Sequence, residues 1–420
     1  MSTDRIDRAV PRSDLRGPAL MLAVATVGFA VNFWAWALLS PLGPRFKELL
    51  GLSAAQQALL VAVPVIVGSL GRIPVGALTD RFGGRVMFPL ISAATIVPVL
   101  FIGLAGHGSL AALLVGGFFL GIGGTAFAVG VPFVSAWFPP ERRGLAVGVF
   151  GMGMGGTAIS ALTTVKLVRT GGSATPFLLT AAVLAVYAMV AWFVLRDAPG
   201  RTAPAQSTMA RLAAAVRLPI TWQACVLYAV TFGGYVSFSV YLPVYLRSAY
   251  GLEQADAADR MAGFVILAVA ARPVGGWLSD RIGAIRVLAA VFAVVALCAT
   301  VLAFTPPLMP LGTVAFLTMA AALGAGSGAT FALVAVAAPA DKVGSVTGLV
   351  GAAGGLGGFV PPVEMGFVYG LFGSYGVGLA LLAGVSVLTL VLTLTAVRAT
   401  ARRRSAALPV PFGPSAEEAR

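Results

Sequence analysis

Long runs of apolar residues alternate with short polar segments along the whole chain. A helix that crosses a bilayer needs about 20 mostly apolar residues, and twelve runs satisfy this requirement. We predict membrane spans at 18–41, 57–79, 86–105, 109–137, 144–167, 175–195, 219–246, 260–279, 286–305, 309–338, 344–370 and 376–397. The fold class expected from this pattern is an all-α membrane protein, because a helix satisfies its own backbone hydrogen bonds in lipid.

The polar segments divide the twelve spans into two sets of six. The longest interruption separates the sixth span from the seventh and reads "RDAPGRTAPAQSTMARLAAAVRL". We predict two six-helix halves that are joined by a cytoplasmic linker and flanked by cytoplasmic tails. The ranges are 1–17 for the first tail, 18–195 for the first half, 196–218 for the linker, 219–397 for the second half and 398–420 for the last tail. The last tail is basic and then rich in Pro and Ala, and we predict that it is disordered.

The two halves contain related sequences. The segment "RIPVGALTDRFG" begins at Arg72 and "RPVGGWLSDRIG" begins at Arg272, an offset of 200 residues. The same offset aligns the glycine-rich segments 142–158 and 344–362. Because each half has an even number of spans, the repeats run parallel and are related by an axis along the membrane normal. Transporters built in this way bind their substrate near the midplane, between the halves.

Charge is scarce and unevenly distributed. Charged residues make up 10% of the sequence, against about 25% in soluble domains. The net charge is +13, and most basic residues fall in the tails, the linker and every second loop. This distribution follows the positive-inside rule with both termini cytoplasmic. We interpret the basic residues as topology signals and predict no nucleic-acid partner.

Several chemistries have no candidate residues. Cys225 and Cys298 fall inside apolar spans, and His107, the only histidine, falls in a loop. Two distant cysteines form no disulfide framework or metal cluster, so we predict no metal and no cofactor. The spans hold no carboxylate pair or nucleophile–histidine set, which argues against an enzyme, and the linker and tails are too short to contain a sensor domain.

Two arginines, Arg72 and Arg272, lie inside otherwise apolar spans. Eight residues separate each from an aspartate, Asp80 or Asp280, at the polar end of its helix, which corresponds to a rise of about 12 Å. Each guanidinium is therefore expected near the membrane midplane, where a charge costs at least about 2.5–3.5 kcal/mol. Either the pair holds a small anion, or each arginine is structural and bonds to backbone carbonyls or to a membrane carboxylate. Pseudo-symmetric cations favour the anion site, because planar guanidinium groups suit planar oxyanions.

Glycines and aromatic residues complete the predicted anion site. Glycine-rich helices let backbones approach closely, and helix packing alone is the alternative explanation for them. Aromatic residues of the fourth and seventh spans are expected at the cavity between the halves, with core packing as the alternative. The predicted lining residues are Gly151, Gly153, Gly155, Gly354, Gly357, Phe127, Tyr228 and Phe232.

Two further groups of charged residues have predicted roles. Charges at the cytoplasmic helix ends are expected to form a salt-bridge network that holds one conformational state, with ordinary loop charge as the alternative. These residues are Asp80, Arg81, Arg85, Asp280, Arg281, Glu141 and Arg142. Glu364 is the carboxylate that lies well inside a span. It either carries a coupling proton, or it snorkels or pairs with Lys166 near the outer side.

These motifs resemble known sequences. The stretch "GALTDRFGGR" resembles the loop signature of the major facilitator superfamily. The two arginine-bearing segments, together with "GMGMGGTA" and "GAAGGLGGF", resemble the nitrate/nitrite porter family over nearly the whole chain. The resemblance implies a bacterial inner-membrane carrier, multi-pass and monomeric, in which Arg72 and Arg272 grip nitrate or nitrite during alternating access.

The resemblance leaves coupling and selectivity open. Uptake of an anion needs either a proton as co-ion or exchange for a second anion. Met154 and Gly355 stand where many family members carry asparagine, so the site is expected to lose neutral polar contacts. The alternative function is a major facilitator carrier for another small organic anion, or a drug exporter.

Overall fold

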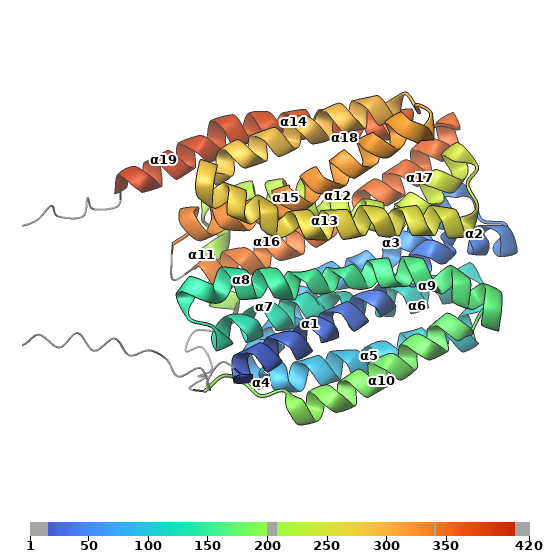
Figure 1. Cartoon of the computed structure of the whole chain (residues 1–420), viewed down its shortest axis with the longest axis horizontal. Coiled ribbons are helices and arrows are strands. Elements are labelled where there is room, and N and C mark those ends of the chain that lie inside the picture. The colour runs from blue at the N-terminus through green and yellow to red at the C-terminus, as the bar shows by residue number, and fades with distance from the viewer. Residues whose placement is uncertain (1–15, 200–207, 340–341, 408–420) are drawn as a thin grey trace, which may run out of the picture.

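The computed structural model describes residues 16–199, 208–339 and 342–407, which are helical apart from short connections (Figure 1). Twelve helical segments within these residues are long and apolar enough to cross a membrane. Six precede the linker and six follow it. The predicted all-α membrane fold with twelve spans is therefore confirmed.

The elements of the first half end before the linker. They are α1 (Arg16–Trp36), α2 (Leu39–Leu50), α3 (Ala54–Leu70), α4 (Arg72–Phe82), α5 (Gly84–Leu104), η2 (Gly106–Gly108), α6 (Leu110–Leu120), η3 (Gly121–Thr125), α7 (Ala126–Trp137), α8 (Pro140–Gly151), η4 (Met152–Gly155), α9 (Gly156–Gly171) and α10 (Thr175–Val194). The linker and the second half contain α11 (Thr208–Val216), α12 (Pro219–Tyr250), α13 (Gln254–Ile282), α14 (Ala284–Ala303), η5 (Leu308–Gly312), α15 (Thr313–Ala337), α16 (Val343–Gly357), α17 (Val360–Phe372), α18 (Gly376–Leu392), η6 (Thr393–Val397) and α19 (Arg398–Ala407).

The halves meet along pairs of helices, one from each half. α13 packs against α9, and α17 and α16 pack against α3 (Figure 1). α12 also contacts α2 and α3. These contacts bring the arginine-bearing helices and both glycine-rich segments to the interface between the halves.

Several spans change helix type where they pass the interface. α3 ends at Leu70 and α4 begins at Arg72, with Gly71 between them. The 3-10 segments η3 and η4 interrupt the fourth and fifth spans. Gly124 of η3 faces Gly68 of α3, where an added Cβ would lie 2.9 Å from the Gly68 Cα. Small residues therefore let the backbones meet beside Arg72.

Two predicted boundaries are wrong. The first span continues through α2 to Leu50 instead of ending near residue 41. The start of the last tail is helical, because the helix continues through α19 to Ala407 with alanines and arginines, which are strong helix formers. Residues 408–420 lie outside the described residues. The linker also contains an ordered helix, α11, which packs against α16.

His107 lies in η2, between the third and fourth spans, and contacts two phenylalanine rings. Its imidazole stacks on Phe46 at 5.8 Å and meets the edge of Phe177 at 5.8 Å between ring centroids. Burial, and then the positive charge of Arg45, lower the pKa of His107 below its usual 6.5. The folded protein therefore favours the neutral imidazole.

We expect His107 to make stability depend on pH. Because its folded pKa is depressed, the unfolded state binds more protons below about pH 6.5. Stability contributed by the neutral ring is present above that pH and is lost as pH falls. Thermal melting of the detergent-solubilised protein at pH 7.5 and 5.5 should show a loss of a few degrees that is smaller in His107→Gln. An equal loss in both proteins would contradict this assignment.

Candidate functional site

Arg72 opens α4 and reaches across to the other half. Its side chain is buried, with 8% exposure. Nη1 donates to the Gly351 carbonyl oxygen of α16 at 2.7 Å. The guanidinium carbon lies 5.3 Å from the Phe127 ring centre and 5.6 Å from that of Phe232. Nε is buried without a hydrogen-bond partner among the described residues. The donor capacity of Arg72 is thus only partly used.

Arg272 approaches the same place from α13. Its Nη1 donates to the Met154 sulfur at 2.8 Å and its Nη2 to the Tyr228 hydroxyl at 2.9 Å. The guanidinium carbon lies 5.7 Å from the Phe232 ring centre and 5.8 Å from that of Phe331. The sulfur of Met154 is thus a weak hydrogen-bond acceptor for Arg272. The polar contact that we expected this site to lose at position 154 is therefore lost only in part.

Both guanidinium groups share the Phe232 ring, at 5.6 and 5.7 Å. Neither forms an ion pair with any acidic side chain in the described part of the chain. Of the two structural alternatives, pairing with a membrane carboxylate is therefore not found for either arginine among the described residues. A bond to a backbone carbonyl is found for Arg72. Each cation–ring contact contributes about 0.5–2 kcal/mol, and none neutralises charge. The arrangement leaves one buried and one half-buried positive charge that an anion would compensate.

The predicted glycines fall into two groups. Cβ atoms added at Gly153 or Gly357 would lie 2.7 Å from Phe29 Cβ and 2.6 Å from the Ala229 carbonyl oxygen. Helix packing, the alternative considered for these glycines, thus accounts for those two. Gly354 leaves the space that Tyr228 and Phe232 occupy. Gly151 and Gly155 face open space.

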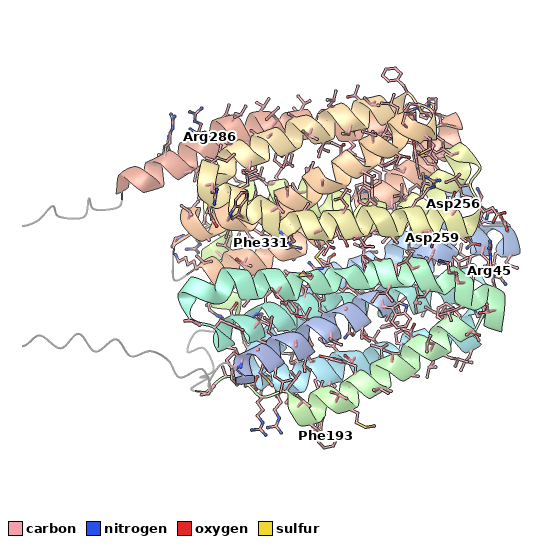
Figure 2. All side chains as sticks on the ribbon, viewed as in Figure 1. Arg45, Phe193, Asp256, Asp259, Arg286 and Phe331 are labelled. Carbon is pink, nitrogen blue, oxygen red and sulfur yellow. The ribbon has the colours of Figure 1, made fainter. Side chains whose placement is uncertain are left out.

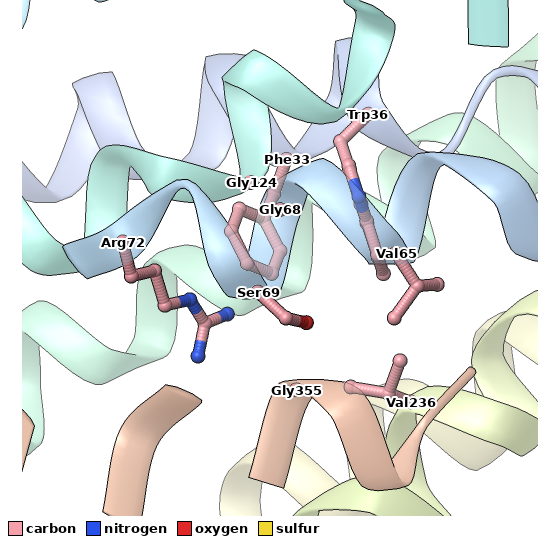
Figure 3. A pocket seen from close by; sticks show the side chains of 9 residues that line it. All are labelled: Phe33, Trp36, Val65, Gly68, Ser69, Arg72, Gly124, Val236 and Gly355. Atoms are coloured by element: carbon pink, nitrogen blue, oxygen red, sulfur yellow. The ribbon is translucent and has the colours of Figure 1, made fainter. Parts of the chain in front are cut away.

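A small cavity lies against Arg72 between the halves (Figure 3). It encloses about 10 Å³ and is lined by Phe33, Trp36, Val65, Gly68, Ser69, Arg72, Gly124, Val236 and Gly355. A volume of this size is close to what one water-sized particle needs. Sequence reasoning identified Arg72 in this lining but missed Ser69, because a lone serine in an apolar helix carries no distinctive pattern.

The chain matches the family model described as "Major Facilitator Superfamily" over residues 25–362 and, in a second match, 260–414. It is 50% identical over 374 residues to the "Probable nitrate/nitrite transporter NarK2" of Mycobacterium tuberculosis, covering 89% of this chain and 95% of that relative. It is 35% identical over 375 residues to the "Nitrite extrusion protein" of Bacillus subtilis, with 89% and 93% covered. The chain belongs to the nitrate/nitrite porter family of the major facilitator superfamily.

Solved structures agree with this fold. A bacterial homologue of the human lysosomal transporter Spinster, in an inward-facing, unoccupied conformation, matches with a TM-score of 0.73 at 19% identity. The match covers 94% of this chain and 99% of that structure. At this identity the likeness concerns the fold alone. Major facilitators are transporters rather than enzymes, so the prediction that this porter is not an enzyme is confirmed.

Ion pairs join the halves of this porter at the far end of the bundle, opposite Arg16 and α19. Figure 2 shows Asp259 at this end. Lys166 of α9 pairs with Asp259 of α13 at 3.1 Å, and Arg169 pairs with Glu253 at 3.5 Å. The alternative that Lys166 pairs with Glu364 is therefore wrong.

Two more contacts tie α2 to α12 at the far end. Glu48 forms an ion pair with Arg247, and the Ser40 hydroxyl donates to the Val240 carbonyl oxygen at 2.7 Å. Sequence reasoning sought a latch in the cytoplasmic loops and missed this far-end set, because the partners come from helices about 90 to 200 residues apart.

At the near end of the bundle, where α1 begins and α19 lies, the described charged residues do not form the single network that we predicted. Asp80 pairs with Arg211 of α11, and Asp197 accepts the Arg85 backbone N–H at 3.2 Å. The linker and its flank thus supply these partners. Arg81 and Arg281 each lie over an aromatic ring of their own helix, and Asp280 has no ion pair with a described residue. The side chains of Glu141 and Arg142 lie outside the described residues, and a gating role for this set stays a prediction.

Glu364 lies in α17, inside the eleventh span. Its Oε1 atom is buried and has no hydrogen-bond partner among the described residues. A Cβ added at Gly378 of α18 would lie 3.1 Å from that oxygen. The carboxyl group therefore points at a neighbouring helix rather than at either arginine.

Proposed function

We propose that this porter moves nitrate, nitrite or both across the bacterial inner membrane by alternating access. The observation that carries the proposal is the convergence of two guanidinium groups, buried Arg72 and half-buried Arg272, on one ring without a carboxylate partner among the described residues. The names of the relatives support the choice of anion. A planar oxyanion between Arg72 and Arg272 would accept from both forks and offset the repulsion between the two cations.

Occupancy of the site couples to movement of the halves. Arg72 already contacts the second half through Gly351, and Arg272 contacts the first half through Met154. An anion held by both arginines would let the halves close over it, whereas the empty site keeps two like charges apart. The pair of guanidinium groups favours a small planar oxyanion over an uncharged or cationic drug as the cargo. Competition of labelled nitrate uptake by nitrite, chlorate and formate in proteoliposomes tests this choice. Strong inhibition by a bulky organic anion and none by nitrite would contradict it.

We place both termini and the linker in the cytoplasm, as the positive-inside pattern indicates. The far end then faces outward, and its ion pairs close the path from outside. In the same proposal, the linker at 196–218 joins the two six-helix halves on the cytoplasmic side. We propose that the porter acts as a monomer, because each chain contains both arginines of the site.

Breaking the far-end pairs is expected to open that end more often. Exposed ion pairs contribute about 0.2–1 kcal/mol each, so Lys166→Ala combined with Arg247→Ala should raise labelling of a Val244→Cys reporter several-fold. Val244 is 1% exposed in the closed arrangement. Rates of maleimide labelling in detergent measure the effect. High salt should also raise the labelling rate of the Val244→Cys reporter, because it screens exposed ion pairs.

Arg260→Ala is the matched control for these variants. Arg260 pairs with Asp256 of its own helix at 3.1 Å, so its loss breaks no contact between the halves. Its labelling rate should equal that of the parent. Equal rates in the double variant would show that the far-end pairs do not hold the closed state.

We propose that Glu364 carries a proton that accompanies the anion. Anion uptake against a negative-inside potential costs about 2.3 kcal/mol per charge for each 100 mV, so a co-ion or an exchanged anion is required. A half-buried carboxyl group with one buried oxygen that has no hydrogen-bond partner among the described residues is suited to bind a proton during part of the cycle. Nitrate added outside proteoliposomes should raise the external pH, and Glu364→Gln should abolish this change.

Asp256→Asn serves as the control, because Asp256 is exposed and lies at the far end. It should leave the nitrate-driven pH change intact. A pH change that persists in Glu364→Gln would exclude this residue as the proton carrier. Nitrate uptake that depends on internal nitrite and moves no proton would establish exchange instead.

A further inference from the structure

Ser69 is a buried serine whose hydroxyl has no hydrogen bond within the described residues. It lies in α3, three positions before Arg72, and is 1% exposed. Every other buried serine in the described residues has a hydrogen bond. Ser279, for example, donates to the Gly275 carbonyl oxygen one turn earlier at 2.7 Å. This local bond is the usual choice of serine in a helix, so Ser69 departs from it.

The hydroxyl points into the cavity beside Arg72. Figure 3 shows the Ser69 oxygen directed away from its own helix, toward the ribbon that carries Gly355. Most of the other lining groups are apolar, and the Trp36 Nε1 is already used by the Pro64 carbonyl at 3.1 Å. The Ser69 hydroxyl thus faces the cavity without a hydrogen bond to another described residue. Arg72 Nε, also buried and without a partner, belongs to the same site.

Gly355 of the opposite half leaves the space that this hydroxyl occupies. A Cβ at position 355 would overlap the Ser69 hydroxyl oxygen and would lie 2.9 Å from the Ser69 Cβ. The Cβ would also lie 3.3 Å from the Ser69 Cα, a lesser contact that a shift of a few tenths of an ångström relieves. Ser69 and Gly355 therefore form a complementary pair across the interface.

We infer that Ser69 is a third anion-binding residue, which donates its hydroxyl proton to an oxygen of the anion held by Arg72. This inference rests on the proposed function and names a neutral donor that the arginine pair lacks. An oxyanion that places one of its oxygens in this water-sized corner would satisfy the hydroxyl and the guanidinium together. Because Gly355 has no Cβ, the Ser69 side chain can adopt the rotamer that points its hydroxyl into the cavity. The ligand class is a small oxyanion with more than one acceptor oxygen.

Ser69→Ala tests the assignment in proteoliposomes with labelled nitrate. Hydrogen bonds to charged groups contribute about 1.5–3 kcal/mol, so the KM for nitrate should rise about tenfold or more. Ser69→Thr keeps the hydroxyl and should retain most of the affinity. Ser279→Ala, which removes a buried serine bonded only to its own helix, is the matched control and should leave KM unchanged.

A double-mutant cycle separates the hydroxyl from general packing. Gly355→Ala should raise the KM by displacing Ser69, and the same change in a Ser69→Gly background should have little further effect. Additive effects of the two changes would overturn the complementary pair. Should Ser69→Ala fail to insert, Ser69→Cys retains the volume and weakens the donor, so its KM should lie between those of Ser and Ala.

The outcomes for Ser69 and for the proposed function are distinct. A nitrate KM within twofold of the parent in Ser69→Ala, in a porter that Arg72→Ala inactivates, would overturn the Ser69 assignment alone. Nitrate transport at the parent rate by a correctly inserted Arg72→Ala would overturn the arginine site itself.

Discussion

Nitrate uptake is expected to fall at least about tenfold when either Arg72 or Arg272 is replaced by Ala, and to vanish in the double variant. Each guanidinium would supply charge-assisted hydrogen bonds of about 1.5–3 kcal/mol, and each 1.4 kcal/mol corresponds to a factor of about ten. Arg→Lys at either position keeps the charge but loses the planar fork, so it should recover little activity. Initial rates of labelled nitrate uptake in proteoliposomes measure these effects.

The control for the arginine variants is an arginine away from the interface. Arg286 lies at the near end (Figure 2), where its Nη1 donates to the Ile282 carbonyl oxygen at 3.3 Å. Arg286→Gln should transport nitrate at the parent rate. Arg72→Ala should fold like the parent, so its melting temperature should be close to that of the parent although its nitrate uptake is lost. Parent-level uptake by both single variants would remove the basis of the anion site.

Gly275→Ala is expected to destabilise the protein strongly for the addition of a single methyl group. A Cβ at position 275 would lie within about 2.5 Å of the Ala325 backbone, because α13 and α15 pack closely at this point. Backbone atoms cannot turn aside, so the helices must separate, at a cost of about 1–3 kcal/mol or more. Melting of the detergent-solubilised protein should occur several degrees lower than in the parent.

Gly276 provides a matched control in the same helix. A Cβ at Gly276 meets nothing within 4 Å, so Gly276→Ala should leave the melting temperature unchanged or raise it slightly through helix propensity. Gly275→Ala should also lower nitrate affinity, because Arg272 lies one turn away and its carbonyl oxygen packs against Gly328 of α15. Equal melting temperatures for the two variants would contradict this account of the α13–α15 contact.

Much of the candidate site could be predicted because the repeat gives it two copies. Arg72 and Arg272 stood out as lone charges in apolar runs, and Phe127, Tyr228 and Phe232 do come together around them. The glycines were harder, because a glycine looks the same in sequence whether it faces a neighbouring helix or open space. Gly153 and Gly357 pack against neighbouring helices, whereas Gly151 and Gly155 do not.

The sequence by itself determined the membrane fold, the number of spans and the two arginines. These follow from local quantities: the length of an apolar run, its charge and the offset of the repeat. The tertiary structure alone decided which groups meet across the interface. Gly351 as the acceptor for Arg72, the far-end pair of Lys166 and Asp259, and Ser69 facing Gly355 all join segments from different halves. Such contacts depend on how two helix bundles are placed against each other, and no local pattern encodes that placement.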